Sequence, residues 1–158
     1  MFGLPIDTCS SVPSKWNDYP ELEKIPEGRT VILSPYAKSV TAFPGEFWED
    51  VVSDHIKAGL EVFTNVSYGE SPLPGTKPLS PKISELKSVV ERAGLFIGIR
   101  SGICDVIRSA DCKKIALYPD YNYSDTKWKA VDIYSIDGFI NIVVEEGMTW
   151  SEIKEKNL

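Results

Sequence analysis

The sequence has few of the residues on which nucleophilic and metal-dependent enzymes most often rely. It contains one histidine and three cysteines among 158 residues. The histidine, His55, falls inside an expected helix, so we predict no Ser-His or Cys-His dyad at a strand end, and the catalytic residues stay unassigned. Cys9, Cys104 and Cys112 are odd in number and lack metal-site spacing, which favours reduced thiols and predicts no bound metal.

Long hydrophobic runs and a surplus of positive charge are also missing. No stretch of 18 apolar residues occurs, so no transmembrane segment is expected, and the N-terminus lacks the pattern of a secretory signal. The formal net charge is -6, which argues against general binding of nucleic acid. We therefore expect a cytoplasmic protein, at most peripheral to the inner face of the membrane. One small phosphorylated ligand held by local donors remains compatible with this composition.

The first part of the chain shows little regular pattern. Residues 1–28 are rich in proline, serine and charge, and we predict an irregular linker or wrap, pinned to the surface by Trp16, Tyr19 and Leu22. Residues 29–158 are expected to form one folded domain that carries the regular pattern. A folded domain rarely begins with so long an irregular segment, so the chain is expected to be part of a longer protein.

Apolar runs and helical periodicity alternate through the rest of the chain. Strands are expected at 30–33, 60–65, 95–98 and 114–118, with weaker candidates at 131–136 and 141–144; helices are expected at 46–58, from Ser80-Pro81 to Ala93, at 103–110, and after a capping box at 149–152. This alternation predicts an α/β fold, a parallel sheet with helices on both faces. Ligands of such sheets bind at the carboxyl ends of the strands.

The first candidate motif is Gly98-Ile-Arg-Ser-Gly-Ile-Cys-Asp105, in which a buried strand runs directly into a helix. We predict that Arg100, Ser101 and Gly102 bind an anion such as a diphosphate. The glycines of the motif allow close approach, the serine adds a hydroxyl, and the arginine offers a bidentate fork at a helix N-terminus. Asp105 would cap this turn or meet a ribose hydroxyl. The alternative is a tight turn without ligand, in which Arg100 pairs with a surface carboxylate.

Two further polar clusters follow strands that should end at the same edge. Ser34, Lys38 and Ser39 come after the first strand and could add hydroxyls and a positive charge around the same anion. Asn65 and Glu70 follow the second strand, where a base or ribose would lie. The alternatives are a polar loop with an exposed lysine in the first case and a simple turn residue in the second.

The order of these motifs resembles the C-terminal, donor-binding half of glycosyltransferases with the GT-B architecture, and most nearly the heptosyltransferase-like proteins of bacterial polysaccharide synthesis. The resemblance rests on Thr30 to Val40, Phe47-Trp48, Thr64-Asn-Val66, Gly69-Glu70, Pro78-Leu79 to Glu85-Leu86, Ala93-Gly94 to Asp105, and Lys113 to Pro119. It runs from about residue 30 to about residue 145. It implies a single GT-B half-domain.

The resemblance also implies roles for individual residues. Ser34 and Lys38 would contact phosphate or sugar, Ser101 and Gly102 the diphosphate, and Asn65 and Glu70 the base or ribose. No metal would be needed, because a helix dipole and cationic side chains stabilise the leaving diphosphate. Classical heptosyltransferases carry an Asp-Thr-Gly-type sequence and then a histidine at this turn, whereas this chain has Arg100-Ser-Gly and no histidine.

Two functions follow from these expectations. In the first, the chain binds the nucleotide-sugar donor of a glycosyltransferase acting in surface polysaccharide or lipopolysaccharide synthesis. A glycan or glycolipid acceptor would then require an N-terminal domain missing here, so the isolated chain is expected to be inactive. The alternative is a free-standing Rossmann-like module that binds a phosphorylated metabolite without catalysis.

Overall fold

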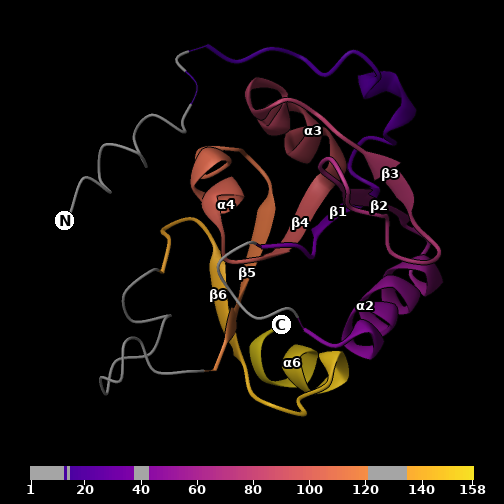
Figure 1. The fold of residues 1–158 in the computed structure, drawn as a ribbon, viewed down its shortest axis with the longest axis vertical. Helices are drawn as coiled ribbons and strands as arrows, with labels where there is room; N and C mark the ends of the chain where they lie inside the picture. Colours follow the sequence, from indigo (N-terminus) through magenta and orange to yellow (C-terminus); the bar gives the residue numbers. More distant parts are fainter. Residues whose placement is uncertain (1–12, 14, 38–42, 121–134) are drawn as a thin grey trace.

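The structure is a computed structural model that describes residues 13, 15–37, 43–120 and 135–158 (Figure 1). In this described part, six strands form one sheet in the order β3-β2-β1-β4-β5-β6, and all neighbouring strands are parallel. The strands are β1 (Thr30–Ser34), β2 (Glu61–Asn65), β3 (Lys77–Leu79), β4 (Gly94–Ile99), β5 (Lys113–Pro119) and β6 (Ile140–Val144). The parallel sheet predicted from the alternating pattern is confirmed.

Helices cover both faces of this sheet (Figure 1). The helices are α2 (Gly45–Lys57), α3 (Leu86–Ala93), α4 (Gly102–Val106) and α6 (Trp150–Asn157), with short 3-10 turns η1 (Leu22–Lys24) and η2 (Ile83–Glu85). Side chains of β1 alternate between the two faces: Ile32 joins the core under α3 and α4, whereas Val31 and Leu33 join the core under α2 and α6. This is the expected Rossmann-like α/β fold, with strands buried on both sides.

The described part of the N-terminal segment lies along α3, as the indigo ribbon in Figure 1 shows. Trp16, Tyr19 and Leu22 pack against the core under α3, as predicted. The backbone amide of Tyr19 also donates to the Ser88 hydroxyl at 3.0 Å. The segment is therefore attached by both apolar packing and hydrogen bonds. The division at residue 28 stays a prediction.

Three local expectations are wrong. The helix expected from Ser80-Pro81 begins later, because the Ser80 hydroxyl donates to the Val66 carbonyl oxygen and Glu85 caps the Lys82 amide instead. Strand β3 lies in a region expected to be loop, where Pro78 obscured it at the edge of the sheet. The helix expected at 103–110 ends at Val106. The strand candidate at 131–136 falls largely outside the described residues.

Among the residues that the structure describes, no helix has both the length and the apolar character of a membrane span. No group of three or more histidine, cysteine, aspartate or glutamate side chains in the described ranges is arranged to hold a metal ion.

Candidate functional site

A hollow of about 300 Å³ lies where β1, β2 and β4 end. Its described lining consists of Ser34, Tyr36, Ala37, Asn65, Ser67, Glu70, Ser101, Gly102 and Ile103, and we call it the β1–β4 hollow. These residues come from three loops that are far apart in the sequence. The carboxyl edge of a parallel sheet brings them together, as in other open α/β sheets. Five residues predicted to bind the donor line this one hollow.

The strand ends hold the polar floor of the β1–β4 hollow in place. Ser34 is the last residue of β1 and pairs in register with Gly98 of β4. Asn65 is the last residue of β2. Ser34 and Asn65 are 3% and 8% exposed, so both offer polar groups from largely buried positions. A ligand can therefore meet groups that the sheet already holds in position.

The two glycines of the Gly98 to Asp105 motif have different roles. A Cβ on Gly98 would lie 2.7 Å from the Phe96 ring and 3.0 Å from the Cβ of Ser34, so the packing of the sheet requires glycine there. A Cβ on Gly102 would meet nothing within 4 Å. Packing within the sheet therefore accounts for glycine at Gly98, which is buried in β4, and its approach to a ligand stays a prediction. Gly102 leaves space open beside the β1–β4 hollow.

Ser101 contributes a hydroxyl that lacks a partner. Its Oγ is buried and is the only buried side-chain polar atom of the described residues with no hydrogen bond. Ser101 is the N-cap of α4, but its side chain makes no capping bond. The neighbouring Cys104 thiol donates to the Ile99 carbonyl oxygen at 3.7 Å, and Ser101 acts to lower the pKa of this thiol. Because buried polar groups are usually satisfied, an unpaired hydroxyl at the edge of a hollow indicates a place for a ligand atom.

The backbone of the same turn is only partly available. The Cys104 amide donates to the Ser101 carbonyl oxygen at 3.0 Å, so it is not available to a ligand. The amides of Gly102 and Ile103 are the first two of α4 and have no partner within the helix. These two amides, with the Ser101 hydroxyl, make up the donor set that the turn presents.

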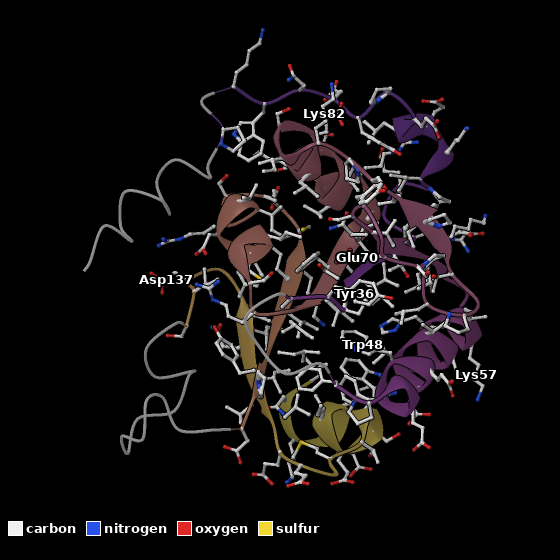
Figure 2. All side chains as sticks on the ribbon, in the orientation of Figure 1. Tyr36, Trp48, Lys57, Glu70, Lys82 and Asp137 are labelled. Atoms are coloured by element: carbon white, nitrogen blue, oxygen red, sulfur yellow. The ribbon has the colours of Figure 1, made fainter. Side chains whose placement is uncertain are left out.

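Glu70 and Tyr36 both line the β1–β4 hollow, and both are labelled near the centre of Figure 2. Its Oε1 accepts from the Ser67 amide at 2.7 Å, which fixes the loop after β2. The Tyr36 hydroxyl donates to the Ser71 carbonyl oxygen at 2.5 Å and ties the loop after β1 to the same region. The sequence prediction missed Tyr36, although it stands two residues after Ser34. Its position in the motif after β1 was the available signal.

Arg100 and Asp105, both predicted to contact the ligand, contact each other. Arg100 Nη1 and Nη2 donate to the two carboxylate oxygens of Asp105 at 3.1 and 3.2 Å, and Nη1 also donates to the Ser101 carbonyl oxygen at 2.7 Å. Neither residue lines the β1–β4 hollow. This arrangement matches the alternative of an arginine paired with a carboxylate. A role for either residue in binding the donor stays a prediction.

Lys38 and Ser39 lie outside the described residues. The described lining of the β1–β4 hollow contains no lysine or arginine. A phosphate contact by Lys38 therefore stays a prediction.

The titratable groups near the turn are poor nucleophiles. Burial raises the pKa of the Cys104 thiol to about 11, against the smaller opposing influence of Ser101 and Arg100. Burial also raises the pKa of Tyr118 to about 12, although Arg100 acts in the opposite direction. Both groups are neutral near pH 7, and a neutral thiol is unreactive.

The comparison with known proteins shows where this fold occurs. No family model and no curated protein matches the sequence. Solved structures do match. E. coli heptosyltransferase WaaC with ADP-2-deoxy-2-fluoro heptose has a TM-score of 0.56 at 14% identity, over 90% of this chain and 49% of that one. The same enzyme with ADP has a TM-score of 0.54 at 13% identity, over 90% of this chain and 48% of that one.

A third match is a glycosyl transferase of family 9 from Veillonella parvula DSM 2008. It has a TM-score of 0.55 at 15% identity, over 91% of this chain and 46% of that one. This chain therefore spans about half the length of the structures that it resembles. At such low identity the similarity establishes the fold alone: the described chain has the fold of one half of a GT-B glycosyltransferase, as the order of its motifs predicts.

Proposed function

We propose that this chain is the donor-binding half of a glycosyltransferase and that it binds a nucleoside-diphosphate sugar in the β1–β4 hollow. One observation carries the proposal. Residues from three separate loops meet around this hollow, and the buried Ser101 hydroxyl within it has no partner. The diphosphate would lie against Ser101 and the amides of Gly102 and Ile103, where helix-terminal donors favour an anion. Asn65 and Glu70 would meet the base or ribose.

The similar structures support this proposal without establishing it. Two of them contain ADP or an ADP-linked sugar analogue. Their polypeptides are about twice as long as the matched region, so transfer by this chain would need a second half that holds a glycan or glycolipid acceptor. We propose a cytoplasmic role in bacterial surface polysaccharide or lipopolysaccharide synthesis, in which the isolated chain binds donor but transfers nothing.

Calorimetric titration with ADP, GDP, UDP and CDP tests the proposal. At least one diphosphate should bind, and EDTA should leave its affinity unchanged because no metal is required. Ser109→Ala, an exposed serine after α4 that does not line the β1–β4 hollow, serves as the matched control for Ser101→Ala. If all four nucleotides fail to bind the folded chain, the proposed donor site is wrong.

A further inference from the structure

A larger hollow, of about 510 Å³, lies at another part of the same sheet edge. It is bounded by the N-terminal part of α2, by the segment that leads into α6 and by the ends of β5 and β6, and it shares no described lining residue with the β1–β4 hollow. Its volume lies within the range of about 300–1,000 Å³ typical of ligand pockets. Its apolar wall includes Phe43, Phe47, Val144 and Met148.

Carboxylate residues surround this apolar wall, and we call the whole the acidic hollow. They come from three segments: Glu46 and Asp50 from α2, Asp120 after β5, and Glu145 and Glu146 after β6. No described lining residue is a lysine, arginine or histidine. A helix N-terminus favours an acid in its first turn, which accounts for Glu46 but not for the residues after β5 and β6.

Most of these carboxylates have no counter-charge within the described chain. Glu46, Asp50, Glu145 and Glu146 form no ion pair with any described residue and are exposed. Like charges gathered around an apolar concavity repel one another, so a cation bound there is favoured. The combination of an apolar wall and an acidic rim defines the chemistry of the occupant.

We propose that the acidic hollow docks a partner polypeptide in which an aromatic or large aliphatic side chain is flanked by lysine or arginine. The apolar side chain would fill the hollow between Phe47 and Met148, because buried apolar anchors contribute most of the binding energy at interfaces. The flanking cations would reach carboxylates on at least two of the three segments. Complementary charge of this kind speeds association and selects the partner.

Other classes of occupant fit these features less well. Anionic membrane surfaces and nucleic acids carry charge of the same sign as the rim. A small amine meets one or two carboxylates and leaves the apolar wall exposed. A polypeptide segment supplies both the apolar group and several spaced cations. This inference goes beyond donor binding and does not depend on it.

A fluorescence-anisotropy titration with three short labelled peptides tests the proposal. The first peptide carries phenylalanine between lysine pairs, the second replaces the phenylalanine with lysine, and the third replaces the four lysines with glutamate. The phenylalanine–lysine peptide should bind at least about tenfold more tightly than the all-lysine peptide. Its affinity should fall with added salt, and the acidic peptide should not bind.

Matched variants locate the peptide on the surface. The triple variant Glu46→Gln, Glu145→Gln, Glu146→Gln should bind the phenylalanine–lysine peptide at least about tenfold more weakly than the wild type. A control triple variant, Glu23→Gln, Glu49→Gln, Glu155→Gln, removes the same charge from exposed residues outside the acidic hollow and should have little effect. Met148→Gln should weaken binding of that peptide several-fold. It should leave the all-lysine peptide unchanged. Circular dichroism would confirm that each variant is folded.

Four results would overturn the proposal. They are no binding by the folded chain, equal affinity for the first two peptides, equal losses in both triple variants, and binding that appears only after the chain's own Lys127-Trp128-Lys129 is replaced by alanines. The last result would make this segment of the chain, rather than a partner, the occupant. Nucleoside diphosphates, added in excess, should not compete with the peptide, because they are expected at the β1–β4 hollow.

Discussion

Arg100 and Asp105 form a bidentate ion pair across the first turn of α4, with nitrogen–oxygen distances of 3.1 and 3.2 Å. The side chains are 16% and 26% exposed, so the pair is shielded from most solvent. Arg100 also donates a hydrogen bond to the Ser101 carbonyl oxygen. The turn that presents the Ser101 hydroxyl is thereby braced by its two neighbouring charged residues, whether or not either one touches a ligand.

Arg100→Ala is expected to weaken the affinity for a nucleoside diphosphate at least several-fold. It removes a positive charge from the residue before Ser101 and also removes the hydrogen bond from Arg100 to the Ser101 carbonyl oxygen. Arg100→Lys keeps the charge but not the bidentate geometry. Its affinity for the nucleoside diphosphate should lie between those of Arg100→Ala and the wild type.

Calorimetry and thermal unfolding, measured on the same samples, separate the two possible roles of Arg100. If Arg100→Ala lowers the melting temperature but leaves the nucleotide affinity unchanged, Arg100 is structural and its proposed contact with the phosphate is wrong. Asp105→Asn provides the comparison, because it breaks the pair from the other side and keeps the guanidinium.

Ser101→Ala is expected to have opposite effects on stability and on binding. The Ser101 hydroxyl is buried without a partner, so its removal should raise the free energy of unfolding of the ligand-free chain by up to about 1 kcal/mol. The same change should weaken diphosphate binding by about tenfold, because it removes a hydrogen bond to a charged group. Urea denaturation and calorimetry measure the two effects. A loss of stability in the ligand-free variant would show that the hydroxyl is satisfied within the protein.

Gly98→Ala and Gly102→Ala form a matched pair with different expected results. Gly98→Ala should lower the free energy of unfolding by about 1–3 kcal/mol, because the added Cβ would lie 2.7 Å from the Phe96 ring. Gly102→Ala should leave stability unchanged or slightly raised, since its Cβ meets nothing within 4 Å and alanine favours a helix. Gly102→Trp should fold normally and weaken nucleotide binding by blocking the β1–β4 hollow. Normal nucleotide affinity in Gly102→Trp would contradict the proposed position of the ligand.

The contacts of the Asp54 carboxylate predict how the stability of the fold depends on pH. It accepts hydrogen bonds from Trp150 Nε1 at 3.0 Å and Lys154 Nζ at 2.7 Å, which tie α2 to α6. Burial acts to raise the pKa of Asp54, but these bonds and the Lys154 charge outweigh it and hold the pKa below the ordinary value of 3.8. A carboxyl with a lowered pKa in the folded state stabilises the fold above pH 4 and loses this effect as the pH falls through the lowered pKa.

Asp54→Asn should therefore be less stable than the wild type at pH 7, and the difference should shrink as the pH falls below about 4. Urea denaturation across this range measures it. Asp50→Asn, which removes an exposed acid that forms no ion pair with a described residue, should show no such trend. A difference for Asp54→Asn that is constant with pH would contradict the stated role of its charge.

The sequence predicted most of the fold because the central strands β1, β4 and β5 contain the apolar runs 31–33, 95–97 and 115–117. It failed where local signals and tertiary contacts disagree. Ser80-Pro81 is a favourable helix start, yet the Ser80 hydroxyl bonds to Val66 across the sheet edge and the helix begins later. Strand β3 has three residues, one of them proline, and only its pairing with β2 defines it.

The site was predicted in part for a related reason. Strand ends are readable from apolar runs, so Ser34, Asn65 and Ser101 could be assigned to one edge and do line one hollow. Side-chain directions are not readable in this way, and the pairing of Arg100 with Asp105 depends on the geometry of the turn. The acidic hollow was missed because its carboxylates belong to three segments, none of which carries a motif by itself.

Backbone amide shifts during a nucleoside-diphosphate titration test the central claim most directly. With the nucleotide that binds best in calorimetry, the largest changes should fall on Ser34, Asn65, Glu70 and Ser101 to Ile103, around the β1–β4 hollow. Residues of the acidic hollow, such as Gly147 and Met148, should not move. Changes concentrated at the acidic hollow, or no changes in a well-dispersed spectrum of the folded chain, would contradict the account.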